Sequence, residues 1–364
     1  MKIYLFQQAG KARPQSRFRG KKFPGRRSGS HIWSWVSLII ALISACACSA
    51  EPAVQQLLGL SAEAPEFLEC RAVSPTEIRF RFSLPVTVSS LRFEPELAVD
   101  SVEGGEEVTV TLQEPLSGGD RFIADILVAD EGGNTLNVLT PFRSRNNEMP
   151  RLVINEIRTE YSKPKVEFVE LRTLTAGNLG GIRLFLTETG TEEPFYEFPP
   201  ARVTAGEYIV VHLRSLDPNS VNETGDDLGA TPSTKENEAW PDSRDFWIPD
   251  AKKHLSRKAG MVYLLDQDDE VLDAILWSES ADPWWADEKL AGAAEFLSSK
   301  SAWVNDREDI PGPGDAISSA YTTATRSISR DQDAPDTNSP ADWYITAASG
   351  ATPGKKNSMK KYQP

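Results

Sequence analysis

The sequence predicts an all-β protein built from two antiparallel domains. Short runs in which apolar and polar residues alternate begin near residue 72, and turn-forming Gly, Asp and Asn residues separate these runs. No helical period interrupts the first of these regions. The 364 residues also suffice for two separate hydrophobic cores.

Residues 1–45 are predicted to form a signal peptide. Nine Lys and Arg residues lie between Lys2 and Arg27, and the first 50 residues contain no Asp or Glu. An apolar run, IWSWVSLIIALISA, follows at residues 32–45. Fourteen residues are too few to cross about 30 Å of hydrocarbon, whereas a basic flank before a short apolar core is typical of an export signal.

The end of this apolar run, LISAC at residues 42–46, resembles the lipobox of bacterial lipoproteins. That resemblance implies that Cys46 is acylated and becomes the mature N-terminus, so that the lipid attaches the protein to a membrane. Cys48 is a less suitable candidate for this role, and an ordinary cleaved signal is the alternative. Because Ala47 is not the Asp that retains many lipoproteins at the inner membrane, we expect the cell envelope, at the outer membrane or cell surface.

The charge of the remaining body limits its partners. Without the leader, 30 basic residues stand against 53 acidic ones, a net charge near −23. Such a body repels phosphate backbones, so nucleic acid is excluded as a partner. The expected partners are the membrane, through the N-terminal lipid, and an envelope protein or glycan. Cys70 is the one cysteine distant from the leader, so no disulfide framework is predicted, although a Cys48–Cys70 bridge is open.

Residues 46–69 are predicted to be a tether, and residues 70–146 the first domain. Its alternating runs are EIRFRF, EVTVTL and RFIADILVAD. The stretches FSLPV, PLSGGDRF and DEGGN resemble those of bacterial Ig-like domains, which implies an antiparallel β-sandwich. In DEGGN, Asp130 and Asn134 are either Asx-turn residues or cation ligands, and the turn is favoured.

Residues 150–357 are similar to the lamin tail domain family. The opening motifs are LVINEI and VEFVEL, followed by GNLGGIRLFL and FPPARVTAGEYIVVH. The closing motifs are SISRDQDAPDTNSPADW and ATPGKKN. The resemblance implies a second Ig-like antiparallel β-sandwich without catalytic activity, in tandem with the first and followed by a tail at residues 358–364.

Two long insertions depart from that family's usual compactness, at about residues 215–252 and 278–324. The second insertion contains DEKLAGAAEFLSSKSAW, in which Leu290, Ala294 and Leu297 have helical spacing. A short helix is therefore expected there.

Two carboxylates, Glu156 and Glu170, lie within predicted strands. Strict alternation places Glu156 on one face with Leu152 and Ile154, near the rim of a core. Since an unpaired buried carboxylate costs several kcal/mol, both are predicted to be structural, accepting backbone N–H groups or pairing with Arg158 or Arg172. The alternative, a catalytic acid–base pair, requires a cleft between the two carboxylates.

The sequence lacks the motifs of other common classes of enzyme. The body has two His and no H-E-x-x-H, P-loop, G-x-S-x-G or G-x-G-x-x-G motif. We therefore expect no enzyme, no cofactor and no metal centre. Two Asp-rich loops could hold a cation, but neither has the complete EF-hand pattern, and solvated turns are favoured; the residues concerned are Asp266, Asp268, Asp331, Asp333 and Asp336.

Tryptophans are concentrated in the insertions. Trp284 and Trp285 are adjacent, and Trp240 and Trp247 lie in the first insertion. They are either a ligand face or side chains that pack the insertions onto the sandwich. The favoured function is a non-catalytic binding, adhesion or scaffold protein. The alternatives are a carbohydrate- or cell-wall-binding module that uses these tryptophans, and an accessory or remnant of an extracellular hydrolase.

Overall fold

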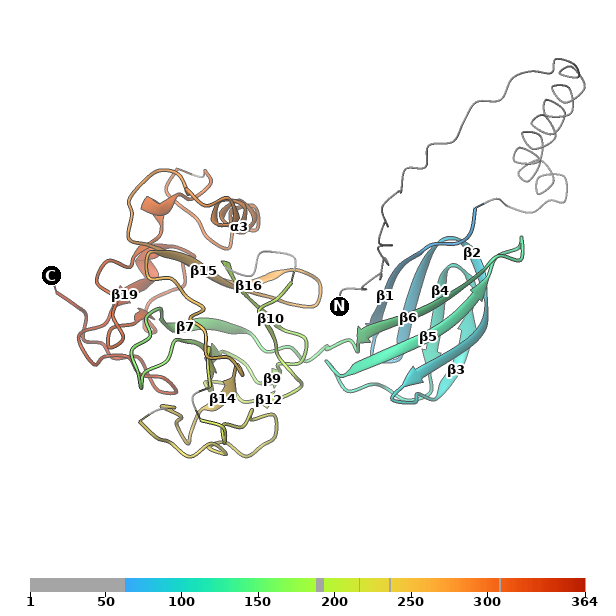
Figure 1. Cartoon of the computed structure of the whole chain (residues 1–364), viewed down its shortest axis with the longest axis horizontal. Helices are drawn as coiled ribbons and strands as arrows, with labels where there is room; N and C mark the ends of the chain where they lie inside the picture. The colour runs from blue at the N-terminus through green and yellow to red at the C-terminus, as the bar shows by residue number, and fades with distance from the viewer. Residues whose placement is uncertain (1–62, 188–192, 216, 236, 308, 364) are drawn as a thin grey trace, which may run out of the picture. The chain divides into compact units, whose positions relative to one another are not determined.

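The computed structural model describes residues 63–363 except 188–192, 216, 236 and 308. The predicted signal peptide, Cys46, Cys48 and most of the tether lie outside the described residues. The prediction of an all-β fold with antiparallel sheets is confirmed (Figure 1). Among the described residues, no helix has the length and apolar character that crossing a bilayer requires.

The first six strands belong to residues 67–143: β1 (Phe67–Ser74), β2 (Glu77–Glu94), β3 (Val99–Glu103), β4 (Gly105–Leu112), β5 (Arg121–Ala129) and β6 (Thr135–Arg143). The first half of β2 pairs with β1 and β4, and its second half pairs with β5. A register shift between Arg81 and Val86 separates the two halves. Ile78, Phe80 and Phe82 are buried in a core with residues of β4 to β6, as the alternation in EIRFRF predicts.

The later strands form a six-stranded sheet, a five-stranded sheet and a two-stranded pair. They are β7 (Leu152–Arg158), β8 (Phe168–Thr173), β9 (Gly177–Asn178), β10 (Arg183–Leu186), β11 (Tyr196–Glu197), β12 (Arg202–Val203), β13 (Tyr208–His212), β14 (Arg244–Trp247), β15 (Ala259–Leu265), β16 (Val271–Ser278), β17 (Ile317–Ser318), β18 (Ile328–Arg330) and β19 (Trp343–Ile345). One sheet has the order β14-β13-β8-β7-β18-β19 and the other β11-β10-β15-β16-β17. Strands β9 and β12 form a separate pair.

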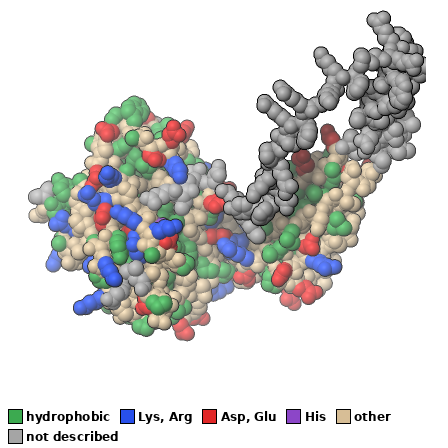
Figure 2. All heavy atoms as spheres, in the orientation of Figure 1, with side chains coloured by type: hydrophobic (Ala, Val, Ile, Leu, Met, Phe, Trp, Pro, Cys, Tyr) green, Lys and Arg blue, Asp and Glu red, His purple; other side chains and the backbone are tan. Residues whose placement is uncertain are grey.

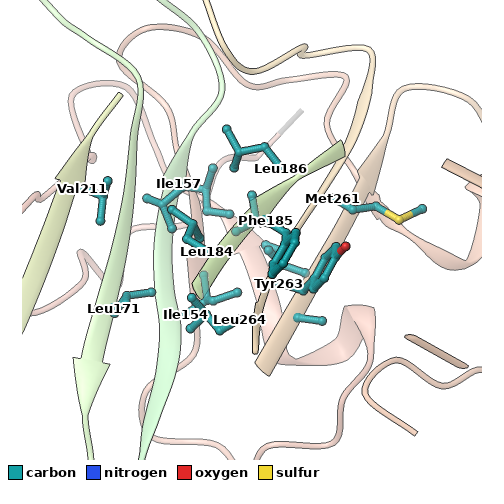
Figure 3. Packing of buried hydrophobic residues seen from close by; sticks show 14 of the residues in the cluster. Ile154, Ile157, Leu171, Leu184, Phe185, Leu186, Val211, Met261, Tyr263 and Leu264 are labelled. Atoms are coloured by element: carbon teal, nitrogen blue, oxygen red, sulfur yellow. The ribbon is translucent and has the colours of Figure 1, made fainter. Parts of the chain in front are cut away.

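A single apolar core links these two sheets. In Figure 3, Ile154, Leu171 and Val211 of one sheet face residues of the other sheet. Within the second sheet, the rings of Phe185 and Tyr263 stack with their centroids 4.9 Å apart. The core thus fixes the inner faces of both sheets, and the outer faces are available for other segments.

The outer face of the five-stranded sheet is covered by helix α3 (Glu288–Ser299) of the second insertion. Asp287 caps this helix by accepting hydrogen bonds from the backbone N–H groups of Lys289 and Leu290. Ala294 and Leu297 are buried, and Leu290 is half-buried. The expected short helix is therefore confirmed. Two 3-10 turns follow it in the chain, η2 (Pro313–Asp315) and η3 (Pro340–Asp342).

Strand β7 departs from strict alternation. A register shift against β8 lies between Ile154 and Glu156, so that Ile154 and Ile157 both enter the core. The expected sharing of a face by Glu156 and Ile154 is therefore wrong. A bulge adds one residue to one strand and reverses the side-chain phase beyond it. Its effect here is to turn Glu156 toward the outer face of the six-stranded sheet.

Candidate functional site

The outer face of the six-stranded sheet carries a layer of buried polar side chains. Glu156 of β7 and Glu170 of β8 are cross-strand partners, and both are 0% exposed. The segment that follows β19 covers them and provides half of their hydrogen-bond donors. This segment contains the motif TPGKKN at residues 352–357, which is the predicted closing motif of the domain.

Glu156 is held by hydroxyl and backbone donors. Its Oε2 accepts from the backbone N–H of Thr352 at 2.9 Å and from the Thr352 hydroxyl at 3.1 Å. Its Oε1 accepts from Ser329 Oγ at 3.1 Å and from the hydroxyl of Ser327. The carboxylate thus receives donors from both β18 and the closing segment.

Glu170 is held by backbone and amide donors. Its Oε2 accepts from the backbone N–H of Gly354 at 2.5 Å, and its Oε1 accepts from Asn155 Nδ2 at 2.5 Å. Asn357 completes the layer, because its Nδ2 donates to the carbonyl oxygens of Asn155 and Arg330 at 3.0 and 2.9 Å. Gly354 and Asn357 of the closing motif therefore satisfy buried polar atoms of β7, β8 and β18.

Burial dominates the protonation of this pair. Desolvation raises the pKa of Glu156, although the donors of Ser327 and Thr352 oppose the rise. Desolvation, followed by the negative charge of Glu156, raises the pKa of Glu170 well above its ordinary value. Both effects make the neutral form of Glu170 easier to hold inside the protein.

Pairing with Arg158 or Arg172 was one of the two expected fates of these carboxylates, and it is not what the structure contains. Arg158 instead forms an ion pair with Glu238 of the first insertion. Arg172 has no carboxylate within ion-pair distance in the described part of the chain. The reason is the phase of β7 and β8, which directs both Glu side chains toward the closing segment.

A second buried cluster was not found from the sequence. His212 Nε2 lies 2.8 Å from Asp245 Oδ1, and both side chains are 1% exposed. The His212 ring stacks on Trp247 with centroids 3.7 Å apart. The first insertion creates this cluster, since its strand β14 pairs in parallel with β13. No motif spacing marks such a pair, because the contact depends on that strand addition.

The four tryptophans do not form one face. Trp247 is buried, Trp285 donates its indole N–H to the carbonyl of Pro311 at 2.7 Å, and Trp240 lies under the Lys355 ammonium at 3.2 Å from the ring centroid. Trp284 is 80% exposed. Three of the four therefore have packing partners, and Trp284 alone of this set presents its ring to solvent.

The Asp-rich loops are engaged by protein groups. Asp268 forms an ion pair with Arg145, and Asp266 accepts the backbone N–H of Asp268 as an Asx turn. In the other loop, the carboxylates of Asp331, Asp333 and Asp336 pair with Lys361, Lys356 and Arg330, respectively. Over the described ranges, no group of three or more His, Cys, Asp and Glu side chains could hold a metal ion.

Two residues of the first sandwich were left open by the sequence. Asn134 donates its backbone N–H and its Nδ2 to the Asp130 carboxylate, each at 2.8 Å, so groups of the same turn satisfy this carboxylate. Cys70 is a free thiol, and burial raises its pKa to about 12. A thiol with so high a pKa is a poor nucleophile at neutral pH.

A cleft of about 390 Å³ opens on the second domain where β7, β8 and the 330–336 loop meet. Its lining includes three arginines, Arg151, Arg172 and Arg330, beside Asn155 and Gln332. We call it the arginine cleft. Guanidinium groups with amides can bind an anion, whereas they are poor general acids because arginine stays protonated. On the face drawn in Figure 2, acidic and basic side chains are interspersed.

A comparison with curated proteins finds a relative of part of the chain. A protein of Treponema pallidum (strain Nichols), described as an uncharacterized protein, is 29% identical over 178 residues. The match covers 47% of this chain and 44% of that relative, so the chain spans less than half of the relative's length.

Solved structures of the bacterial S-layer protein SbsC also align with the chain. Its N-terminal part has a TM-score of 0.23 and 14% identity, covering 65% of this chain and 48% of that one. Its domains 1–6 have a TM-score of 0.23 and 12% identity, covering 65% and 42%. Likenesses this weak carry no argument about fold or function.

The family comparison is more extensive. Residues 150–345, more than half of the chain, match the family model TP_1001_2nd, described as a protein second domain. This range includes every strand from β7 to β19. The chain therefore belongs to the TP_1001_2nd family.

Proposed function

We propose that this protein is a non-catalytic binding protein of the bacterial envelope. In this proposal the acylated Cys46 attaches it to the outer membrane or cell surface, and an Ig-like domain followed by a lamin-tail-like domain forms the body. One observation carries the proposal. Two pairs suited to acid–base chemistry, Glu156–Glu170 and His212–Asp245, are at most 1% exposed, whereas the accessible arginine cleft contains groups suited to binding.

The burial argument is chemical. A general acid or base must come within hydrogen-bond reach of its substrate or of a water molecule that serves it. The oxygens of Glu156 and Glu170 accept hydrogen bonds from Thr352, Gly354 and Asn155 instead. A substrate would have to displace the closing segment to reach them, which would remove the donors of Thr352 and Gly354 from two buried carboxylates.

The anchor is tested by metabolic labelling with a palmitate analogue. The wild-type chain and the Cys48→Ala variant should incorporate the label, and the Cys46→Ala variant should not. An unlabelled wild-type chain released from cells would show that the leader is an ordinary cleaved signal.

The binding role is tested by crosslinking in intact cells followed by recovery of the full chain. A defined envelope protein or glycan should be recovered with it. In parallel, the purified chain is assayed for hydrolysis of envelope polymers and phosphate esters. An activity that Glu156→Gln abolishes while the fold persists would refute the non-catalytic assignment.

The exposure of Trp284 favours a second candidate, a glycan-binding module. A tryptophan ring that is 80% exposed can stack on the face of a sugar ring. Glycan-array binding that is lost in Trp284→Ala would support this candidate. Binding that is unchanged in Trp284→Ala would exclude this ring as the recognition element.

A further inference from the structure

Two arginines of the arginine cleft have no anionic partner among the residues that the structure describes. Elsewhere in the described chain, arginines such as Arg145, Arg158 and Arg214 pair with Asp or Glu side chains. Arg151 and Arg172 make no such pair, and Arg172 Nε is buried without a hydrogen-bond acceptor. Because so acidic a chain has many carboxylates available, two uncompensated guanidiniums in one cleft call for an external anion.

The acidic residues of the cleft do not neutralise these arginines. Asp336 lies 2.8 Å from Arg330 Nη1, and Arg330 also donates through Nη2 to the buried Asp273 at 2.6 Å. Asp331 pairs with Lys361 at 3.2 Å. Asp336 and Asp273 therefore share Arg330, Asp331 pairs with Lys361, and none of the three forms an ion pair with Arg151 or Arg172.

The positions of the two arginines follow from the strands. Arg172 is the cross-strand neighbour of Val153 on β7 and of Tyr208 on β13. Arg151 immediately precedes β7, and its backbone carbonyl accepts the N–H of Leu174 at 2.7 Å. Both residues are thus attached to hydrogen-bonded backbone, which fixes the spacing of the two guanidiniums better than a free loop would.

The rest of the cleft is suited to a small organic molecule. Its volume of about 390 Å³ is within the range of small-ligand sites, roughly 300–1,000 Å³. Leu152, Leu174 and Leu272 provide apolar lining. Gln332 is held in place by its Nε2, which donates to Asn155 Oδ1 at 2.7 Å and to the Tyr208 hydroxyl at 3.3 Å. A bare inorganic anion would leave the leucines without a contact.

We infer that the arginine cleft binds a small organic carboxylate, whose carboxylate group pairs with Arg151 and Arg172 and whose apolar part lies against the leucines. This inference rests on the proposed binding function and names its ligand chemistry. The net negative charge of the body does not prevent it, because charges beyond about 8 Å are screened at physiological salt while the two guanidiniums are in contact. Carboxylates of this kind occur at peptide C-termini and in acidic sugars.

The test is calorimetric titration of the full chain with matched probes. N-acetyl-alanyl-leucine represents a peptide C-terminus, glucuronate represents an acidic sugar, and the C-terminal amide of the dipeptide removes the charge at nearly constant shape. Binding by either carboxylate supports the inference, and the tighter one identifies the source. The amide should bind at least about tenfold more weakly than the free acid, because it loses a charge-assisted hydrogen bond.

Variants assign the binding to the two arginines. Arg172→Gln and Arg151→Gln should each weaken the better probe by about tenfold or more. Arg92→Gln is the matched control, since Arg92 is an exposed arginine of β2 outside the cleft with no ion pair among the described residues, and it should leave affinity unchanged. An unchanged thermal midpoint shows that each variant is folded.

Three outcomes would overturn the inference: no binding of either carboxylate, equal binding of acid and amide, or tighter binding of inorganic phosphate than of both carboxylates. The crosslinking experiment separates this failure from failure of the proposed function. If Arg151→Gln and Arg172→Gln recover the same envelope partner as the wild-type chain, the protein is a binding protein whose partner uses another surface.

Discussion

Replacing Gly354 with alanine should detach the closing segment from the buried carboxylates. Gly354 has a φ of +79°, a conformation that L-residues with a side chain rarely adopt. A Cβ at this position would lie 2.5 Å from Ser243 Oγ and 2.7 Å from Trp240 Cβ. The backbone must therefore move, and this movement would break the 2.5 Å hydrogen bond from Gly354 N–H to Glu170.

The expected loss of unfolding free energy has two parts. The left-handed backbone costs an alanine about 1–2 kcal/mol. Loss of the hydrogen bond to the Glu170 carboxylate costs about 1.5–3 kcal/mol. We therefore expect Gly354→Ala to lower the free energy of unfolding by about 2.5–5 kcal/mol.

Gly206 provides the matched control. It has nearly the same conformation, with a φ of +85°, but a Cβ there would meet nothing within 4 Å. Gly206→Ala should therefore show the backbone cost alone, about 1–2 kcal/mol. Urea denaturation of the full chain, followed by tryptophan fluorescence, measures both variants. Equal losses in the two variants would refute the claim that Gly354 holds the closing segment.

Three further predictions concern the second domain. Burial raises the pKa of Asp273 to about 6, although the charge of Arg330 opposes the rise. The folded state therefore binds the Asp273 proton more tightly than the unfolded chain does. The stability that this proton contributes is complete below about pH 3.8 and is lost as the pH rises through about 6. The contribution of Asp273 to the urea-derived free energy of unfolding should fall by about 2 kcal/mol between pH 4.5 and 7, and a rise would contradict the assignment. Trp247→Ala should lower the free energy of unfolding by about 3–5 kcal/mol, because the ring is buried against His212. Trp284→Ala should change it by less than about 0.5 kcal/mol, because that ring is exposed. Similar shifts of the thermal midpoint in the two variants would contradict this difference. In helix α3, Leu297→Ala should lower the free energy of unfolding by about 2–5 kcal/mol. Leu290 is half-buried, so Leu290→Ala should lower it by less. The reverse order in thermal denaturation would mean that another face of the helix is buried.

Regular spacing of apolar residues predicted two elements correctly from the local sequence. The alternation in EIRFRF placed Ile78, Phe80 and Phe82 in a core, and the spacing of Leu290, Ala294 and Leu297 located helix α3. In both cases one buried face and a regular period carry the signal. These features do not depend on which distant segment provides the other side of the core.

The bulge in β7 and the added strand β14 were not predictable in the same way. A single inserted residue leaves no period to detect, yet it moves Glu156 from the expected core face to the opposite one. Strand β14 lies in a segment that reads as polar, and it is a strand because β13 offers a free edge. Tertiary pairing rather than local propensity decides both features.

The arginine cleft could not be predicted from the sequence for a related reason. Arg151, Arg172 and Arg330 are separated in sequence, and although Arg330 lies in the closing motif SISRDQDAPDTNSPADW, no spacing rule relates the three to one another. Their grouping depends on the antiparallel pairing of β7 with β8 and with β18. The lack of a counterion at Arg151 and Arg172 is a property of the folded surface, which no spacing rule reports.

The closing segment forms hydrogen bonds with residues far earlier in the sequence, and this separation affects when the domain can fold. Thr352 donates to Glu156 across 196 positions of sequence, and Gly354 donates to Glu170 across 184. A polypeptide emerges from the ribosome with its N-terminal part first, so strands β7 and β8 become available long before their donors do. Until residues 352–357 have been synthesised, the nascent domain holds two carboxylates that favour water over the interior. Commitment to the native state is thereby postponed to the end of the domain's translation.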